Sequence, residues 1–414
     1  MAKAYIVKRR ARKAAELLKN EGFLNTLIFS LQRLQKTQQR TSRAKKIEFS
    51  FLAHTHDILK ANWSATPYKP PKTKTNPPYT INWVMSPPGK GGGGHQNIFR
   101  FIHYLERQGH TCRVYLYSVH AYRPVKDIRQ DMAASYPKTK ASMKWLKGPM
   151  APADTVFATG WETAYPVFND AGSARKFYFV QDFEPYFYSV GSEYVLAENT
   201  YKFNFHGITA GGFLAKKLHT DYGMQCDNYE FGADTSLYRF ENKGQRKEVF
   251  FYARPVTTRR GFELGIMTLQ LFHEQQPDYK IVLAGWDVSE YDIPFPYENL
   301  KELTLGQLSD VYNRCAAGLV ISLTNMSLLP LELLAAGTIP VVNDGPNNRL
   351  VSNNAYIKYA EPSPSALAQA LVETVTRPDL PEHAKKAAQS VAGLDWEQAG
   401  KKMEAALVQE LSNG

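Results

Sequence analysis

The sequence predicts an α/β protein built from two doubly wound parallel sheets that face each other across a cleft. Two separate series of strand and helix patterns carry this prediction, one starting at Tyr79 and the other near Glu248. In both series, short apolar runs rich in β-branched residues alternate with amphipathic segments of about 10 to 15 residues, a pattern typical of parallel βαβ units. Such sheets bind ligands at the carboxyl ends of their strands, so we expect functional residues to follow strands.

The composition is that of a globular protein preceded by a basic arm. Of the 414 residues 43% are hydrophobic, which suffices for two domains and an extension. Residues 1–75 carry 17 lysines and arginines against 4 acidic residues, whereas the whole chain has a net charge of +11, so the body is nearly neutral. Leucine spacing indicates helix in this arm, and residues 68–79 form a proline-rich linker. The arm either packs on the body or attaches the protein to anionic lipid or an acidic acceptor.

The cysteines and the hydropathy of the sequence indicate where in the cell the protein is found. Cys112, Cys226 and Cys315 show no C-x-x-C spacing, which argues against a disulfide framework or a zinc site and favours a reducing cytoplasm. No apolar run approaches the ~20 residues that cross a membrane, and the N-terminus lacks the apolar core of a signal peptide. We therefore expect a cytoplasmic protein, either free or peripheral on the inner face of the cell membrane.

Residues 321–343, ISLTNMSLLPLELLAAGTIPVVN, predict a strand, a loop, a short helix, a tight turn and a second strand. Ser327 is placed to cap the helix, Pro330 falls in its first turn, and Gly337 ends it. The free N–H groups at the start of such a helix suit phosphate. Glu332, a single carboxylate within the apolar helix, suits sugar hydroxyls. Together these features indicate a nucleotide-sugar site.

Two further loops follow predicted strands and carry candidate binding residues. Residues 89–94, GKGGGG, open a helix and let a ligand approach backbone N–H groups, although such a loop can also be a flexible connection. In the second series, Arg254 ends a strand, and Arg259 and Arg260 precede a helix. Guanidinium groups in this position fit a diphosphate through bidentate hydrogen bonds, or they are simply exposed loop arginines.

The segment QDFEPYFY, residues 181–188, places two carboxylates among aromatic rings. Asp182 and Glu184 follow another predicted strand. Carboxylates beside aromatic faces suit sugar binding or acid–base catalysis. The alternative is a structural loop in which the aspartate caps a helix.

Taken together, these elements resemble the family 4 glycosyltransferases, retaining enzymes of the GT-B fold, over roughly residues 80–412. The matching segments are GGGGHQNIFRFIHYLERQGH, FGADTSLY, ARPVTTRRG, LGQLSDVY, LPLELLAAGTIPVV and DWEQAGKKMEAAL. With the basic arm and QDFEPYFY, the chain is similar to bacterial rhamnosyltransferases of polysaccharide assembly, in particular those of S-layer glycans. The resemblance implies a basic helical extension (1–75), an acceptor-side Rossmann-like domain (76–230), a donor-side Rossmann-like domain (231–390) and a terminal helix that crosses back (391–414).

The resemblance also implies roles for individual residues. Arg254 and one of Arg259 and Arg260 would bind the diphosphate, and Glu332 would bind ribose. Thr324 stands where the family has the first glutamate of its E-x(7)-E signature, so one carboxylate is missing. With Met326 and Leu328, it would form a less polar pocket that fits the methyl group of a 6-deoxy sugar.

The complete set of site predictions is as follows. The nucleotide-sugar site comprises Arg254, Arg259, Arg260, Leu305, Gly306, Thr324, Ser327, Leu328, Leu329 and Glu332. The catalytic candidates are Arg254, Arg260, Asp182 and His95, of which His95 could instead cap a helix. The acceptor-side loop is Gly91, Gly92, Gly93 and Gly94. We expect no metal ligand and no cofactor.

The implied reaction is the retaining transfer of L-rhamnose from dTDP-β-L-rhamnose to a hydroxyl of a growing, lipid-linked cell-surface glycan. The expected partners are this donor, a glycan acceptor and, through residues 1–75, an anionic membrane. The same reaction with a UDP- or GDP-sugar is one alternative, and a non-catalytic sugar-binding protein is another. Nucleic-acid binding is a further alternative, but the nearly neutral body argues against it.

Overall fold

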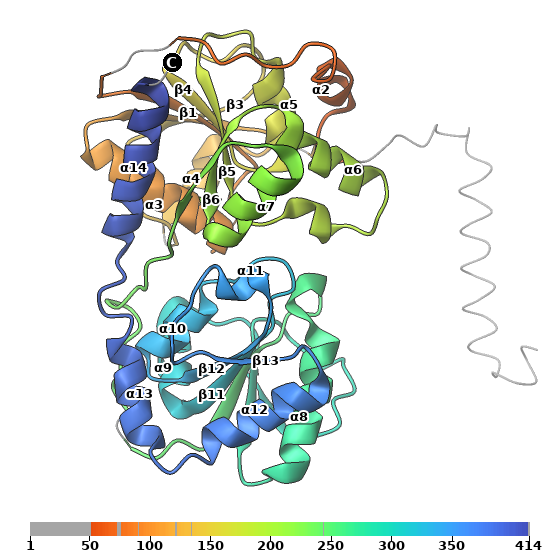
Figure 1. Cartoon of the computed structure of the whole chain (residues 1–414), viewed down its shortest axis with the longest axis vertical. Coiled ribbons are helices and arrows are strands. Elements are labelled where there is room, and N and C mark those ends of the chain that lie inside the picture. The colour runs from red at the N-terminus through yellow and green to blue at the C-terminus, as the bar shows by residue number, and fades with distance from the viewer. Residues whose placement is uncertain are drawn as a thin grey trace, which may run out of the picture. The chain divides into compact units, whose positions relative to one another are not determined.

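The computed structural model describes residues 51–72, 76–89, 91–120, 122–133, 135–242 and 244–412. It divides the chain into two compact units, residues 1–50 and residues 51–414. The helix predicted in the basic arm lies outside the described residues. The second unit contains two parallel sheets, each covered by helices (Figure 1).

The first sheet has seven parallel strands in the order β3-β2-β1-β4-β5-β6-β7. The strands are β1 (Thr80–Met85), β2 (Thr111–Leu116), β3 (Ser142–Trp145), β4 (Thr155–Ala158), β5 (Arg175–Val180), β6 (His206–Ala210) and β7 (Cys226–Tyr229). The associated helices are α2 (Thr55–Lys60), α3 (Gly93–Arg107), α4 (Val125–Ala133), α5 (Trp161–Asn169), η1 (Glu184–Phe187), α6 (Ser192–Asn199), η2 (Thr200–Lys202) and α7 (Gly212–Tyr222). The central strands β4 and β5 are buried along their whole length, because helices cover both faces of the sheet.

The second sheet has six parallel strands in the order β10-β9-β8-β11-β12-β13. The strands are β8 (Glu248–Tyr252), β9 (Lys280–Ala284), β10 (Tyr297–Asn299), β11 (Cys315–Val320), β12 (Ile339–Asn343) and β13 (Lys358–Ala360). The helices are η3 (Thr258–Arg260), α8 (Phe262–Gln275), α9 (Leu305–Arg314), α10 (Leu329–Ala335), α11 (Pro346–Arg349), α12 (Pro364–Val375) and α13 (Leu380–Gln389). Counted within itself, each sheet follows the order 3-2-1-4-5-6 of doubly wound folds. The predicted fold class is therefore confirmed.

We call the part built on β1–β7 the first domain and the part built on β8–β13 the second domain. The last helix, α14 (Trp396–Ser412), packs on α3 and β7 of the first domain (Figure 1). Gly400 permits this packing, because a Cβ atom there would lie only 2.4 Å from the Tyr104 ring. Tyr104 also donates a hydrogen bond of 3.0 Å to Glu404. The chain thus crosses between the domains twice, once after β7 and once before α14.

Residues 51–72 pack on the first domain ahead of its first strand. The Tyr117 hydroxyl donates to Asp57 at 2.8 Å, and the Lys176 ammonium lies 5.0 Å from the Tyr68 ring centroid. All three cysteines are free thiols. Among the described residues, no helix combines the length and apolar character needed to cross a membrane.

Candidate functional site

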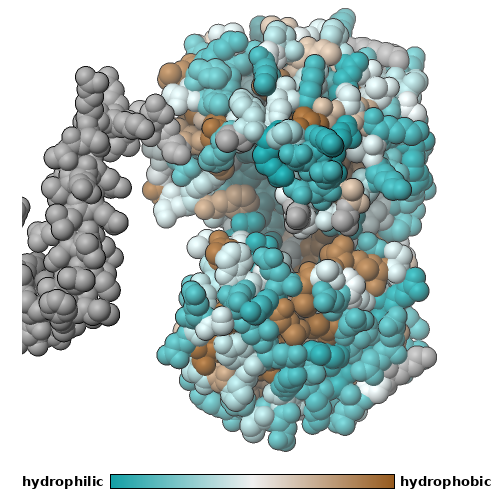
Figure 2. Space-filling view, turned by 180° about the vertical axis from the view of Figure 1, so that it is seen from behind, coloured by the Kyte–Doolittle hydropathy of each residue, from teal (hydrophilic) through white to brown (hydrophobic). Residues whose placement is uncertain are grey.

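A cavity of about 430 Å³ lies between the two domains, at the carboxyl ends of their strands. Figure 2 shows the molecule hollowed between the two halves of the described part. The first domain contributes its glycine-rich loop, α3 and the loop after β5, and the second domain contributes η3, α9 and α10. The volume falls within the range of ligand pockets, and the place is the one expected for doubly wound sheets.

A cluster of three arginines follows β8 at this edge of the second sheet. Arg259 and Arg260 line the cavity, whereas Arg254 is not part of the lining. Arg260 donates a hydrogen bond of 2.6 Å to the Ser322 hydroxyl. The Nε atoms of Arg254 and Arg259 are buried and form no hydrogen bond.

The charge of this cluster is poorly compensated by the protein itself. Burial lowers the pKa of Arg260 to about 10; Asp182 opposes this shift, and the nearby positive charges of Arg259 and Arg254 add to it. Guanidinium groups with unused donors at a strand end form a site for an anion with several oxygens.

Asp182 faces the arginines from the loop that follows β5 in the first domain. Its carboxylate lies 3.4 Å from Arg259 Nε, and the Arg259 guanidinium lies 4.2 Å from the Phe187 ring centroid. Burial raises the pKa of Asp182, and this rise is opposed by Arg260, Arg259 and the hydroxyl of Thr324. The predicted site residues Asp182, Arg259 and Arg260 are thus brought together from different domains.

Thr324 lies beside this carboxylate, which gives its departure from the family pattern a physical explanation. The residue is 3% exposed, and its hydroxyl forms no well-aligned hydrogen bond, although it is near enough to lower the pKa of Asp182. A glutamate in place of Thr324 would add a second negative charge to a buried carboxylate. Asp182, which belongs to the first domain, therefore places a carboxylate near the position where the second domain has Thr324 in place of the family's glutamate.

Glu332 lies on α10 and lines the cavity with a partly buried carboxylate that has few partners. Among the residues that the structure describes, the one hydrogen bond to its carboxylate is a long one, 3.5 Å from the Tyr312 hydroxyl. Burial raises the pKa of Glu332 to about 7, Arg100 and the Tyr312 hydroxyl act against this rise, and Asp234 adds to it. A carboxylate with such a pKa and with spare acceptor capacity suits the hydroxyls of a bound sugar or nucleoside.

Arg100 is a residue of this site that the sequence analysis missed. It lies on α3 of the first domain and lines the cavity on the side of Glu332. In the sequence it falls within an amphipathic helix, where an arginine normally faces solvent. No sequence signal separates it from the other arginine of that helix, Arg107.

The predicted start of the short helix is wrong in one respect. Its N-cap is Leu328, which has no capping side chain, so Ser327 does not cap the helix but lines the cavity. Pro330 does fall in the first turn, and Gly337 follows the helix with φ of +74°. Because α10 has only seven residues, its dipole contributes little, and we attribute anion binding to the arginines.

The structure brings most of the remaining predicted residues to the cavity. Leu305, Leu328, Leu329, Gly91, Gly93 and Gly94 line it, whereas Gly92, Gly306, Thr324 and His95 do not. The Gly92 N–H donates to the Tyr136 hydroxyl at 2.8 Å, which anchors the glycine-rich loop.

His95 is held away from the cavity by the strand end before the loop. Its Nε2 bonds to the Ser86 carbonyl oxygen at 2.9 Å, and burial lowers its pKa, so the ring is neutral. The alternative role as a helix cap is wrong, because α3 is capped by the backbone of Gly92 without a side-chain bond. His95 therefore links α3 to the end of β1 and does not line the cavity.

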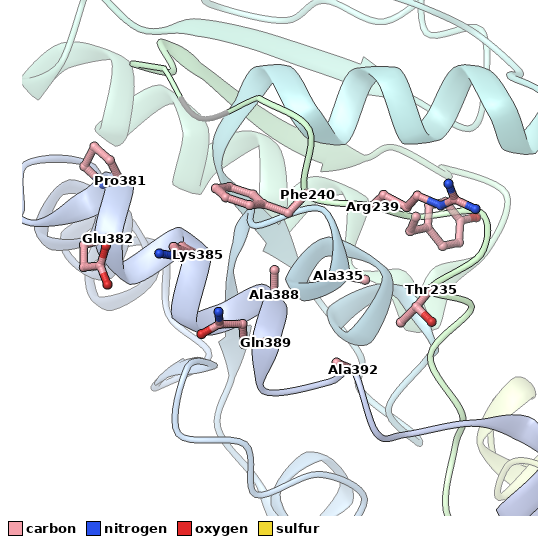
Figure 3. A pocket seen from close by; sticks show the side chains of 11 residues that line it. Thr235, Arg239, Phe240, Ala335, Pro381, Glu382, Lys385, Ala388, Gln389 and Ala392 are labelled. Carbon is pink, nitrogen blue, oxygen red and sulfur yellow. The ribbon is translucent and has the colours of Figure 1, made fainter.

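A second cavity, of about 640 Å³, lies in the second domain between residues 235–240 and α13 (Figure 3). Phe240, Arg239 and Lys385 are among its lining residues. None of the predicted site residues reaches it, so the cleft between the domains remains the candidate site. In the part of the chain that the structure describes, no three His, Cys, Asp or Glu side chains are grouped as metal ligands would be.

Comparison with known proteins shows the family to which the chain is similar. The N-terminal domain model of WsaF matches residues 139–210, and its C-terminal domain model matches residues 247–372. The O-antigen biosynthesis protein RfbC of Myxococcus xanthus is 33% identical over 332 residues, which are 77% of this chain and 26% of the relative. The chain thus spans about a quarter of the length of that curated relative.

Solved structures share the fold at low sequence identity. HepE of Anabaena, in complex with UDP and glucose, has a TM-score of 0.62 at 12% identity, covering 80% of this chain and 100% of HepE. WaaG, a glycosyltransferase involved in lipopolysaccharide biosynthesis, has a TM-score of 0.58 at 12% identity, covering 81% of this chain and 100% of WaaG. The chain therefore belongs with the proteins that carry the WsaF N- and C-terminal domains, and its two doubly wound domains form the GT-B fold of glycosyltransferases.

Proposed function

We propose that the chain is a retaining glycosyltransferase that moves L-rhamnose from dTDP-β-L-rhamnose to a hydroxyl of a growing, lipid-linked cell-surface glycan. The observation that carries this proposal is that an arginine cluster and the Glu332 carboxylate meet in one interdomain cavity. Arg259 and Arg260 line the cavity together with Glu332. The first two fit a diphosphate and the third a nucleoside hydroxyl, and these are the two fixed parts of every nucleotide-sugar.

In this proposal the arginines accelerate the reaction by stabilising the departing diphosphate. Negative charge grows on the leaving group as the glycosidic bond breaks, and preorganised cations in a buried site lower the energy of that state. We expect no metal requirement, because Arg254 and Arg260 would supply the positive charge that a metal ion supplies elsewhere. Asp182, beside the same arginines, would bind the acceptor hydroxyl or the donor sugar.

The choice of rhamnose rests on the polarity of the pocket and on the WsaF domains. Met326 and Leu328 line the cavity, whereas Thr324 is buried behind the lining, so the sugar would meet apolar groups on this side. A 6-deoxy sugar presents a methyl group that suits such a surface. UDP- and GDP-sugars with the same reaction remain the alternative donors, and the O-antigen relative supports a cell-surface glycan as acceptor.

A thermal-shift screen of nucleotide-sugars tests the donor. We expect dTDP-β-L-rhamnose to raise the melting temperature more than UDP- or GDP-sugars, since a ligand at 100 times its Kd stabilises the folded state by about 2.7 kcal/mol. A larger rise in melting temperature with a UDP- or GDP-sugar would change the assigned donor and leave the assigned reaction unchanged. No shift with any nucleotide-sugar, together with salt-sensitive binding to DNA or RNA, would contradict the proposal.

The basic arm gives a separate prediction about the acceptor. Residues 1–50 carry 13 lysines and arginines against 3 acidic residues, and each basic residue near an anionic surface contributes about 1 kcal/mol. Deleting them should lower activity about tenfold or more on a lipid-linked acceptor in anionic vesicles. The deletion leaves residues 51–72 in place, because these pack on the first domain.

The control for this deletion is a short soluble acceptor assayed in parallel. Its turnover should stay unchanged, and the difference between the two acceptors should shrink as salt is raised, because salt screens exposed charges. Equal loss on both acceptors would assign the arm a structural role.

A further inference from the structure

The Arg100 side chain lines the cavity and touches both segments that cross between the domains. Its Nη2 lies 3.4 Å from an oxygen of Asp234, which belongs to the crossing after β7. Its guanidinium lies 4.2 Å from the ring centroid of Trp396, the first residue of α14. The position of the Arg100 side chain therefore depends on both segments that join the domains.

The position of the Arg100 side chain is fixed by neighbours in the first domain. Its Nη1 donates to the Asn97 side chain at 3.1 Å, and Asn97 in turn donates to Gln181 at 3.1 Å. Gln181 also donates to the Gly94 carbonyl at 3.1 Å. A continuous chain of hydrogen bonds therefore joins the glycine-rich loop to Arg100, whose side chain is only 14% exposed.

Glu332 lines the same cavity as Arg100 from the second domain, and the positive charge of Arg100 acts on its carboxylate. Four ionisable side chains face the Glu332 carboxylate: Arg100 from α3, Tyr312 from α9, and Asp234 and Tyr238 from the crossing after β7. Arg100 is the one cation among them. Without it, Glu332 would keep two phenols and a like charge as neighbours, in a buried place.

We propose that Arg100 is a positioning residue of the nucleotide site, which supplies the counter-charge that lets the buried Glu332 carboxylate accept a nucleoside hydroxyl. The proposal rests on the proposed function and deepens it. Arg100 also contacts Asp234 and Trp396, one in each segment that joins the domains. The ionisation of Glu332 therefore depends on the conformation of these two segments. The nucleotide half of the site is thereby linked to the junction between the domains.

The test measures affinity for a nucleotide-sugar, dTDP-rhamnose or UDP-glucose, between pH 6 and 8.5 by calorimetry. The diphosphate of a nucleotide-sugar has no second phosphate proton, so its charge is constant in this range. Wild-type affinity should rise with pH through about 7, as Glu332 loses its proton. In Arg100→Met the midpoint should move up by about one pH unit, which weakens binding about threefold at pH 7.5. Arg100→Lys should restore the wild-type midpoint.

Arg107→Met is the matched control, because Arg107 lies on the same helix and pairs with Glu397 of α14 at 3.0 Å. This variant removes a contact between α3 and α14 without changing the charge that faces Glu332. Its midpoint should equal that of the wild type. If Arg100→Met weakens binding by the same factor at every pH, as a merely structural contact would, the proposal is overturned.

A second readout needs no ligand and separates this proposal from the proposed function. Because the folded pKa of Glu332 is raised above its usual 4.5, its burial costs stability that grows with pH and levels off above about 7. The melting temperature of Glu332→Gln should therefore exceed that of the wild type by a margin that stops growing near pH 7. In the Arg100→Met background this margin should keep growing for about one further pH unit. The same plateau in both backgrounds would overturn the role of Arg100 even if no nucleotide-sugar binds.

Discussion

Replacing Arg260 with alanine should lower kcat for nucleoside diphosphate release by about 10²- to 10³-fold, the usual effect of removing one preorganised group from a developing anion. Arg254→Ala should have a comparable effect, and the double variant should be nearly inactive. The reason is geometric: the arginines follow the same strand, and among the described residues the buried Nε of Arg254 forms no hydrogen bond, while that of Arg259 has only the ion pair with Asp182. The measurement is release of dTDP from dTDP-rhamnose in the presence of acceptor.

Protein stability offers an internal control for this prediction. Arg260 is a buried cation close to two other cations, and burial together with these neighbours lowers its pKa to about 10, so its removal should not lower the melting temperature. Arg377→Ala is the matched control, because this exposed arginine pairs with Asp379 at 2.8 Å and does not line the cleft cavity. Unchanged turnover in Arg254→Ala and Arg260→Ala would refute the assignment of the diphosphate site.

Asp182→Asn is the second substitution with a large expected effect. If the carboxylate accepts a proton or a hydrogen bond from the reacting hydroxyl, kcat should fall by about 10²- to 10⁴-fold. Affinity for the nucleotide-sugar should not fall, since Asp182 pairs with Arg259 and its negative charge opposes the binding of a diphosphate to the arginines. Turnover measured at saturating donor separates the two effects.

A substitution at Thr324, made alone and together with Asp182→Asn, provides the comparison for this experiment. Thr324→Glu restores the family's missing carboxylate but places it beside Asp182, so we expect lower activity and lower stability from like-charge repulsion. Combining Thr324→Glu with Asp182→Asn should recover part of the stability, because one carboxylate is again present in the site. If Asp182→Asn has wild-type turnover, or if the two substitutions are strictly additive, Asp182 does not act as proposed.

The central strands could be predicted from the sequence because each is a buried apolar run. Strands such as β1, β5 and β11 are buried almost throughout, and the helix between β11 and β12 is bounded by a proline and a glycine. The edge strands β3, β7, β10 and β13 were not predicted. Each has only three or four residues, and most of these residues are partly or fully exposed. Their sequences therefore show neither an apolar run nor a clean alternation of apolar and polar residues.

The second-domain half of the site could be predicted because its residues follow strands in short, recognisable segments. The first-domain half could be predicted only where residues follow a strand, as Asp182 does. Arg100 was missed because its role depends on packing between distant helices. Ser327 was misread because tertiary contacts shape its loop: Asn325 donates hydrogen bonds of 3.1 Å to the carbonyls of Gln181 and Ala210 in the first domain.

The central claim is that a nucleoside diphosphate binds in the cleft between the domains, and a crystal structure of the protein with dTDP tests it most directly. We predict that the diphosphate lies within hydrogen-bond distance of Arg259 and Arg260, which line the cavity, and that the 3′-hydroxyl of the deoxyribose lies within hydrogen-bond distance of Glu332. A nucleotide bound elsewhere, for example in the cavity beside α13 shown in Figure 3, would contradict the account.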